Sequence, residues 1–261
     1  MVTIQGIQTS QRVYRSMTYC VAMALKDGLI FASDSRTNAG VDHIATFRKM
    51  HIFEMPGERL IVLLTAGNLA TTQSVISLLE QRARTELHNL LNVQTMYDAA
   101  LLVSDTIHEV ITRDSRNEAI TQGIDLTGSF IMGGQIRGEK PRLFNIYPQA
   151  NFIESTLDTP YFQIGESKYG KPIIDRVVHF ETPLAEALKC TLISFDSTIR
   201  SNLSVGLPID ILRYQADSFA PVRPYRIEET NVYFNRIRES WGQGLRNVFS
   251  QIANADWFDK L

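Results

Sequence analysis

The sequence lacks several features that would place it in other classes of protein. Only two of its 261 residues are cysteine, Cys20 and Cys190, so a disulfide framework is excluded. No apolar run approaches the length that spans a bilayer, and the first sixteen residues lack the apolar core of a secretory signal. These absences predict a cytoplasmic protein that does not insert into membranes.

An excess of charge of one sign is missing as well. The chain has 26 Lys and Arg against 28 Asp and Glu, which gives a formal net charge of -2. Because nucleic-acid binding needs a basic face, we do not expect a nucleic-acid partner. Motifs for metals and phosphates are also absent: His108-Glu109 lacks the second histidine of a zinc-protease helix, and no phosphate-binding loop is present. We therefore expect no metal ion and no organic cofactor.

Linkers, repeats and low-complexity tracts are absent too, so nothing divides the main part of the chain. Residues 1–17 differ from the rest, since residues 1–16 contain no acidic residue. We expect an N-terminal extension or pro-segment over residues 1–17, with Met17 as the functional start, and a single domain over residues 18–261.

The chain does contain an ordered series of strand and helix patterns. Strands are expected at 18–25, 29–33, 49–54, 59–64, 129–135, 142–147, 161–164 and 225–233. Helices are expected at 68–87, from 95 to 111, at 167–178, at 183–202 and near the C-terminus from 234 to 252. Strand pairs joined by hairpins, with helices in pairs, predict an α+β fold in which two antiparallel sheets lie between helical layers.

The chemistry is concentrated at the first hairpin. A hairpin brings the start of its first strand close to the end of its second, so Thr18 and Asp34 are expected to be neighbours, with Lys49 entering the same corner. If Thr18 is the first residue, its α-amine can take the hydroxyl proton, because that amine has a reference pKa of about 7.7–8.0. A threonine that opens a strand is usually structural, so these residues alone leave both interpretations open. Cys20 is expected to be buried in its strand rather than to act as the nucleophile.

The segment from Thr18 through Asp34-Ser35-Arg36 and Gly40 to Lys49, followed by Thr65-Ala66-Gly67, resembles proteasome β-subunits and HslV, the bacterial proteasome-like peptidase. The phrases Phe-Ala-Ser-Asp-Ser-Arg-Thr-Asn-Ala-Gly-Val-Asp and Gly-Glu-Ser-Lys-Tyr-Gly-Lys-Pro are most similar to the bacterial Anbu, or ancestral β-subunit, branch. The resemblance implies the four-layer αββα sandwich of the N-terminal-nucleophile (Ntn) hydrolases.

The resemblance also implies the roles of particular residues. Thr18 would supply the nucleophile and the basic amine, Asp34 would orient Lys49, and Lys49 would tune the nucleophile. The backbone N–H of Gly67 would stabilise the oxyanion. The residues implied to contact the substrate are Thr37, Asn38, Phe47, His51, Thr65 and Leu69.

The pattern departs from the family at two places. Where the family has Gly-Ser-Gly, this chain has Gly165-Glu166-Ser167, so either Ser167 reaches the site or Glu166 takes a charged role there. A carboxylate near the amine would raise the amine's pKa and favour its non-basic form. The family's Asp and Ser lie three residues apart, whereas Asp196 and Ser201 are separated by five and Thr198 has the family's spacing. Asp196 and Ser201 are nevertheless carried over as expected catalytic residues.

The leading hypothesis is a threonine endopeptidase that cleaves peptides or unfolded proteins through an acyl-enzyme. The resemblance implies a ring-like homo-oligomer, and an ATP-dependent unfoldase as a possible partner. An Ntn amidohydrolase of small amides is one alternative. A catalytically weak or inactive proteasome-like scaffold ring is the other.

Overall fold

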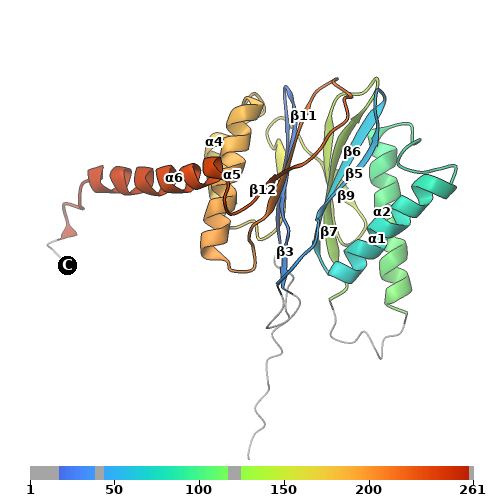
Figure 1. The fold of residues 1–261 in the computed structure, drawn as a ribbon, viewed down its shortest axis with the longest axis horizontal. Helices are drawn as coiled ribbons and strands as arrows, with labels where there is room; N and C mark the ends of the chain where they lie inside the picture. Colours follow the sequence, from blue (N-terminus) through green and yellow to red (C-terminus); the bar gives the residue numbers. More distant parts are fainter. Residues whose placement is uncertain (1–17, 39–43, 117–124, 259–261) are drawn as a thin grey trace, which may run out of the picture.

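The structure, a computed structural model, describes residues 18–38, 44–116 and 125–258. Two five-stranded antiparallel sheets lie face to face at its centre, and helices cover both outer faces (Figure 1). This arrangement confirms the predicted α+β sandwich with two antiparallel sheets between helical layers.

The first sheet contains the hairpin that carries Thr18 and Asp34. Its strand order is β10-β1-β2-β11-β12. The strands are β1 (Tyr19–Leu25), β2 (Gly28–Asp34), β10 (Tyr161–Gly165), β11 (Ile209–Gln215) and β12 (Tyr225–Ile227). Because β1 pairs with β2 on one side and with β10 on the other, the first strand of the domain lies inside the sheet, not at its edge.

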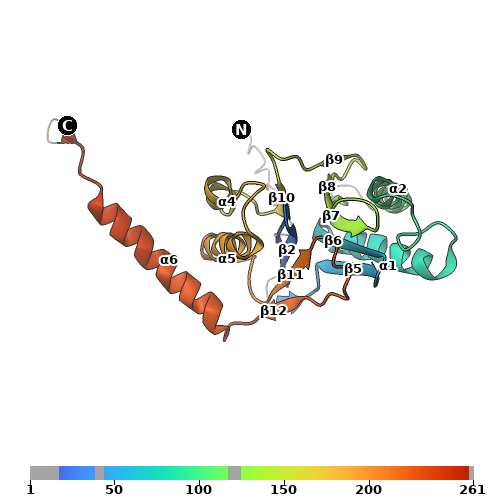
Figure 2. The same cartoon turned by 90° about the horizontal axis from the view of Figure 1, so that it is seen from above.

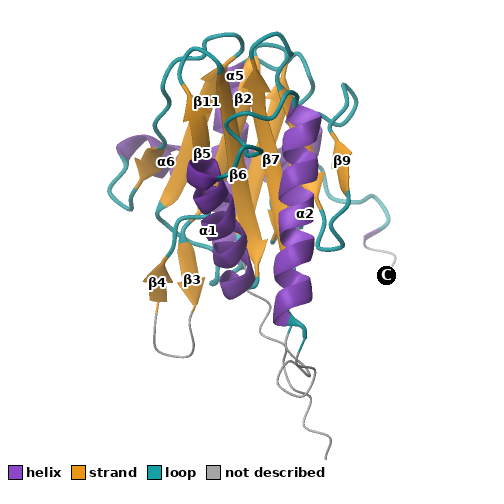
Figure 3. Cartoon of the chain, turned by 90° about the vertical axis from the view of Figure 1, so that its right-hand side faces the viewer, coloured by secondary structure: helices purple, strands orange, loops and turns teal. Residues whose placement is uncertain are grey.

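The second sheet follows the chain in simple order, β5-β6-β7-β8-β9. Its strands are β5 (Met50–Met55), β6 (Arg59–Gly67), β7 (Gly128–Ile136), β8 (Arg142–Ile146) and β9 (Phe152–Glu154). A separate two-stranded ribbon, β3 (Arg36–Asn38) with β4 (Ile44–Thr46), projects from one end of the sandwich (Figure 3). This ribbon joins β2 to β5.

The helices form the two outer layers. On the second sheet lie α1 (Leu69–Thr85) and α2 (Met96–Asp114), which Figure 3 shows in front of the strands. On the first sheet lie α4 (Lys171–Val177) and α5 (Leu184–Ser201) (Figure 2). The predicted cap of the first helix is present, since the Asn68 side chain accepts a hydrogen bond from the Thr71 N–H at 3.1 Å.

Three apolar cores correspond to the three spaces between the four layers. The alternation of β1 shows how one strand serves two of them: Tyr19, Val21 and Met23 face α4 and α5, whereas Cys20 and Ala22 face the second sheet. All five side chains are buried. This double burial is why the segment reads as apolar on both faces.

Two sequence expectations were wrong near the C-terminus. Strand β11 was not expected, and the strand expected at residues 225–233 ends at Ile227. The Asn231 side chain accepts a hydrogen bond from the Phe234 N–H at 2.9 Å, which caps α6 (Val232–Gln251) and starts the helix there.

Helix α6 projects away from the layered body (Figures 1 and 2). Phe234 and Ile237 at its start are buried against the body, whereas Leu245, Val248 and Phe249 in its second half are exposed. None of the helices in the described part of the chain combines the length and apolarity needed to cross a membrane.

Candidate active site

The expected neighbours Thr18 and Asp34 meet at the end of the first sheet where β1 begins and β2 ends. Thr18 immediately precedes β1 and is 2% exposed. The backbone N–H of the next residue, Tyr19, donates to Asp34 Oδ1 at 3.1 Å. The hairpin therefore places the buried Asp34 carboxylate against the backbone of Tyr19, the residue that follows Thr18, as the sequence predicts.

Lys49 enters the same corner from the chain that leads into β5. Its Nζ donates to Asp34 Oδ1 at 2.7 Å and to the carbonyl oxygen of Arg36 at 2.7 Å. Both side chains are buried. Asp34 Oδ1 thus accepts from the lysine and from the Tyr19 N–H together, which couples the ion pair to the backbone beside Thr18.

Burial is also the main influence on the charge of Asp34. It raises the pKa of Asp34 to about 6, while the Lys49 ammonium and the backbone N–H groups of Tyr19 and Gly206 act in the opposite direction. At neutral pH the carboxylate is therefore ionised and paired with the lysine.

The carbonyl group of Thr18 is held from the other side by the end of β10. It accepts the Glu166 N–H at 2.6 Å. Gly165, just before, has a φ of +80°, and a Cβ placed there would lie 1.8 Å from the Thr18 carbonyl oxygen. Only glycine fits both the backbone angle and the approach.

Gly67 ends β6 close to the same corner. The Thr65 N–H, two residues earlier, donates to the Lys49 carbonyl at 3.0 Å, and the Cys20 thiol contacts the Thr65 carbonyl at 3.5 Å. Gly67 has a φ of +105°, and a Cβ on it would lie 2.6 Å from the Thr127 carbonyl. Only glycine therefore fits at this position, whose N–H the family resemblance assigns to the oxyanion.

At the departure Gly165-Glu166-Ser167, the structure brings Glu166 to Thr18 through the backbone. The Glu166 carboxylate is 11% exposed, accepts the Asn202 amide at 2.8 Å and pairs with the Lys168 Nζ at 3.3 Å. The Ser167 N–H donates to the Gly165 carbonyl at 3.0 Å. The acidic residue is thus a fixed part of the corner.

The two residues carried over from α5 have different surroundings. The buried Asp196 carboxylate accepts from Arg200 Nε at 3.1 Å and from Arg238 Nε, on α6, at 3.0 Å. These contacts join α5 to α6, and they offset the cost of burying the Asp196 carboxylate. Ser201 is exposed at the end of α5. The described contacts of these two residues do not include Thr18, Asp34 or Lys49.

The residues expected to contact the substrate come from β3, from the chain before β5 and its first residues, from the end of β6 and from the start of α1. The backbone of Thr37 and Asn38 forms part of β3, and their side chains lie outside what the structure describes. Thr65 is buried, while Phe47 and Leu69 are half-buried. The Phe47 N–H donates to the Ser35 carbonyl at 2.9 Å.

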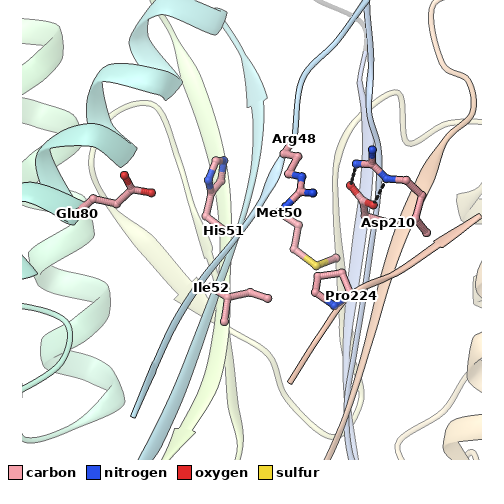
Figure 4. A pocket seen from close by; sticks show the side chains of 8 residues that line it. Arg48, Met50, His51, Ile52, Glu80, Asp210 and Pro224 are labelled. Carbon is pink, nitrogen blue, oxygen red and sulfur yellow. Dashed lines mark hydrogen bonds and ion pairs between the residues drawn. The ribbon is translucent and has the colours of Figure 1, made fainter. Parts of the chain in front are cut away.

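His51, the remaining expected substrate contact, lines a pocket of about 460 Å³ beside the edge strand β5 (Figure 4). Burial lowers the pKa of His51 to about 4, so its imidazole is neutral at physiological pH. The pocket has charges of both signs, and one pair, Asp210 with Arg226, is joined by two hydrogen bonds of 2.8 Å. Its lining residues are Arg48, Met50, His51, Ile52, Glu80, Asp210, Pro224 and Arg226.

The sequence interpretation missed Tyr19 and Gly206, whose N–H groups contact Asp34. A Cβ on Gly206 would lie 2.4 Å from the guanidinium carbon of Arg36, so a side chain there would displace that guanidinium, and no local sequence pattern reports either contact. Among the described residues, no group of three or more His, Cys, Asp or Glu is arranged to hold a metal ion.

Comparison with known proteins adds an independent observation. The family model described as proteasome subunit matches residues 16–211. A Pseudomonas aeruginosa structure described as the helical assembly of the Anbu complex is 58% identical, with a TM-score of 0.88 over 91% of this chain and 98% of that chain. Anbu from Yersinia bercovieri is 60% identical, with a TM-score of 0.86 over 92% and 100%. No curated protein sequence matches this chain.

Proposed function

Because this chain belongs to the proteasome subunit family, we propose that it is a threonine endopeptidase that hydrolyses peptide bonds through an acyl-enzyme on Thr18. One observation carries the proposal. Asp34 Oδ1 accepts hydrogen bonds both from Lys49 Nζ and from the N–H that follows Thr18. This contact fixes a buried lysine charge next to the threonine, where the chemistry of an N-terminal nucleophile needs it.

In the proposed reaction, the mature chain lacks residues 1–17 and begins at Thr18. The Thr18 α-amine takes the proton from Oγ, and Oγ forms a bond to the substrate carbonyl carbon. The carbonyl oxygen becomes an oxyanion that the Gly67 N–H stabilises. The C–N bond then breaks and the leaving amine takes the proton. Water attacks the ester carbonyl carbon, with the α-amine again as base. The C–Oγ bond then breaks, Oγ takes the proton back from the amine, and the acid product leaves.

Lys49 and Asp34 would act on this reaction through charge. A cation next to Thr18 lowers the pKa of both its hydroxyl and its amine, which makes each more reactive at neutral pH. Asp34 holds the lysine in place and balances its charge in the buried corner. The aspartate must be ionised to do so.

Fluorogenic peptides and a β-lactone or epoxyketone probe test this proposal. The wild-type protein is expected to cleave peptides and to be captured by the probe, Thr18→Ser to retain part of both activities because it keeps a hydroxyl, and Thr18→Ala to lose both. Peptide cleavage by Thr18→Ala at the wild-type rate would overturn the assignment of the nucleophile.

Glu166 favours a second candidate function, a proteasome-like scaffold whose site is not competent. The Glu166 backbone N–H donates to the Thr18 carbonyl. A carboxylate close to the α-amine raises that amine's pKa and keeps it protonated. This candidate predicts neither peptide cleavage nor probe capture by the wild-type protein. Recovery of capture in Glu166→Gln, which removes the charge and keeps the size, would assign the inactivity to the carboxylate.

We further propose that the chain self-associates through α6 into a ring-like homo-oligomer. Exposed apolar residues along and beyond this helix have no covering layer within the described chain: Leu245, Val248, Phe249, Ile252, Trp257 and Phe258. The Pseudomonas aeruginosa relative is described as a helical assembly. Light scattering should show that Phe249→Ser lowers the molar mass, whereas the exposed control Gln243→Ser leaves it unchanged. An unchanged mass in Phe249→Ser would refute the role of α6.

The proposed substrates are peptides or unfolded proteins, delivered in the cytoplasm by an ATP-dependent unfoldase. Both cysteines are free and buried, which suits a reducing compartment. Pull-down from the native host with the Thr18→Ala protein, in the presence and absence of ATP, tests for the unfoldase. No ATP-dependent partner would argue against that part of the proposal.

A further inference from the structure

Tyr19, the residue after the proposed nucleophile, forms the centre of a buried hydrogen-bond chain. Its ring is fully buried beneath α5 and lies 4.6 Å from the Phe195 ring, centroid to centroid. Its hydroxyl lies 3.0 Å from Ser194 Oγ, and the Gln163 amide donates to it at 2.5 Å. The side chain thus connects β1 to β10 and to the helical layer.

The direction of each hydrogen bond in this chain can be assigned. Ser194 Oγ donates its single proton to the Thr191 carbonyl at 2.6 Å, so it accepts from the Tyr19 hydroxyl. The Gln163 amide can only donate through its nitrogen, so the tyrosine oxygen accepts there. The Tyr19 and Ser194 hydroxyls therefore each donate one hydrogen bond and accept one, which makes the position of the tyrosine well defined.

The same residue holds the corner through its backbone. The Tyr19 N–H donates to Asp34 Oδ1, the oxygen that also binds Lys49. A displacement of the tyrosine ring would therefore move the N–H that meets the ion pair, and with it the preceding residue, Thr18.

Gly170 shows how closely the hydroxyl is enclosed. A Cβ on Gly170 would lie 2.3 Å from the Tyr19 hydroxyl oxygen, 2.8 Å from the ring carbon that bears it and 3.2 Å from Ser194 Cβ. The two glycines in Gly165-Glu-Ser-Lys-Tyr-Gly170 thus serve consecutive residues. Gly165 makes room for the Thr18 carbonyl, and Gly170 makes room for the Tyr19 hydroxyl.

A nucleophile at the chain terminus needs such an anchor. Terminal residues fray unless they are tied to the body, and once residues 1–17 are removed nothing precedes Thr18. A displacement of about 1 Å in a reacting group can cost about 10²-fold in rate. Besides the pairing of β1 with β2 and β10, the contacts that hold the terminus are then the Thr18 carbonyl with Glu166 and the three hydrogen bonds of Tyr19, with Asp34, Ser194 and Gln163.

We propose that Tyr19 is a positioning residue that fixes Thr18 against the Asp34–Lys49 pair through its hydroxyl contacts with Ser194 and Gln163. The catalytic part of this inference rests on the proposed peptidase function. The structural part, an anchored start of β1, does not depend on any activity.

Tyr19→Phe tests the inference, with Tyr214→Phe as the matched control. The Tyr214 hydroxyl is also buried and donates to Gln135 Oε1 at 2.8 Å, but Tyr214 pairs with Leu29 at the far end of the same sheet. Both variants lose one buried hydroxyl: that of Tyr19 contacts Ser194 and Gln163, and that of Tyr214 contacts Gln135. Only Tyr19→Phe is expected to lower kcat and the rate of β-lactone capture, by at least about tenfold with little change in KM.

Amide hydrogen exchange gives a readout that needs no activity. Exchange at the Tyr19 and Cys20 amides should be at least about tenfold faster in Tyr19→Phe than in wild type, and unchanged in Tyr214→Phe. If exchange and capture in Tyr19→Phe match the control, the inference is overturned. If the wild-type protein captures no probe, the peptidase proposal fails, and the exchange result alone decides whether Tyr19 anchors the strand.

A double variant separates positioning from general loss of stability. Gly170→Ala should slow capture because its methyl group displaces the Tyr19 ring. In Gly170→Ala/Tyr19→Phe the hydroxyl oxygen, the atom nearest the new methyl group, is gone. The double variant should therefore be less impaired than the product of the two single effects. If the loss of capture in the double variant equals the product of the two single losses, Gly170 does not act through Tyr19.

Discussion

Breaking the buried pair between Asp34 and Lys49 should destabilise the protein far more than removing both charges. In Asp34→Asn, Lys49 keeps the Arg36 carbonyl as a partner but loses its counter-charge, and the residue is only 4% exposed. A buried charge without its partner costs about 3–5 kcal/mol. Since each kcal/mol lowers Tm by about 2–4 °C in a chain of this size, we expect a fall of about 6–20 °C.

The double variant Asp34→Asn/Lys49→Met should recover most of that loss. Neutral replacements of similar volume remove the desolvation cost of both ions, and the new amide oxygen still accepts the Tyr19 N–H. Both variants are expected to be poor catalysts, because each lacks the ion pair beside Thr18. The double variant should therefore recover stability without recovering activity.

Differential scanning calorimetry at one pH and one protein concentration measures the effect, because self-association makes Tm depend on concentration. Glu154→Gln is the control. It breaks a pair with Arg142 of the same length, 2.7 Å, in which the Glu154 side chain is 36% exposed, and should cost less than about 1 kcal/mol. The reasoning is refuted if the Tm of Asp34→Asn equals that of the control, or if the Tm of the double variant is no higher than that of Asp34→Asn.

Three further predictions concern the same corner. Because burial raises the folded-state pKa of Asp34 to about 6 and the proposed reaction needs the ionised carboxylate, probe capture should rise as pH rises through 6. A flat capture profile from pH 5 to 7 would contradict this. Gly165→Ala should lower Tm and capture more than Gly57→Ala, which has a similar φ of +84° but no atom within 4 Å, because only the former meets the Thr18 carbonyl. Gly67→Ala should likewise slow capture more than Gly57→Ala, and equal effects would exclude a role for the backbone N–H of Gly67 in capture.

Local signals predicted most of the fold because its elements follow simple periodicities. The first hairpin and the Asn68 cap are encoded within a few residues, and the structure has both. Strand β11 was missed because Asp210 and Arg213 interrupt its apolar pattern, although Gly206 and Pro208 mark a turn before it. The boundary before α6 was missed because Tyr225 and the residues after it resemble a strand, and only the capping bond of Asn231 ends that pattern.

The candidate site was predictable to the extent that sequence neighbours share it. Asp34 follows from the hairpin, and Lys49 from the strand that comes next, with the family resemblance to support both. The contact between Tyr19 and Ser194 spans 175 positions, and no local pattern reports a partner at that distance. Asp196 shows the opposite limit, since the family resemblance carried it over to the site although Thr198 has the family's spacing, and its carboxylate binds arginines on α5 and α6.

The most direct test of the central claim is the intact mass of the protein, purified from its own host, before and after treatment with a β-lactone probe. We predict a chain that begins at Thr18 and gains the mass of one probe molecule, with the adduct on Thr18. A chain that keeps Met17, or an adduct that persists in Thr18→Ala, would contradict the proposed mechanism, because the α-amine of Thr18 would not be free or Thr18 would not be the nucleophile.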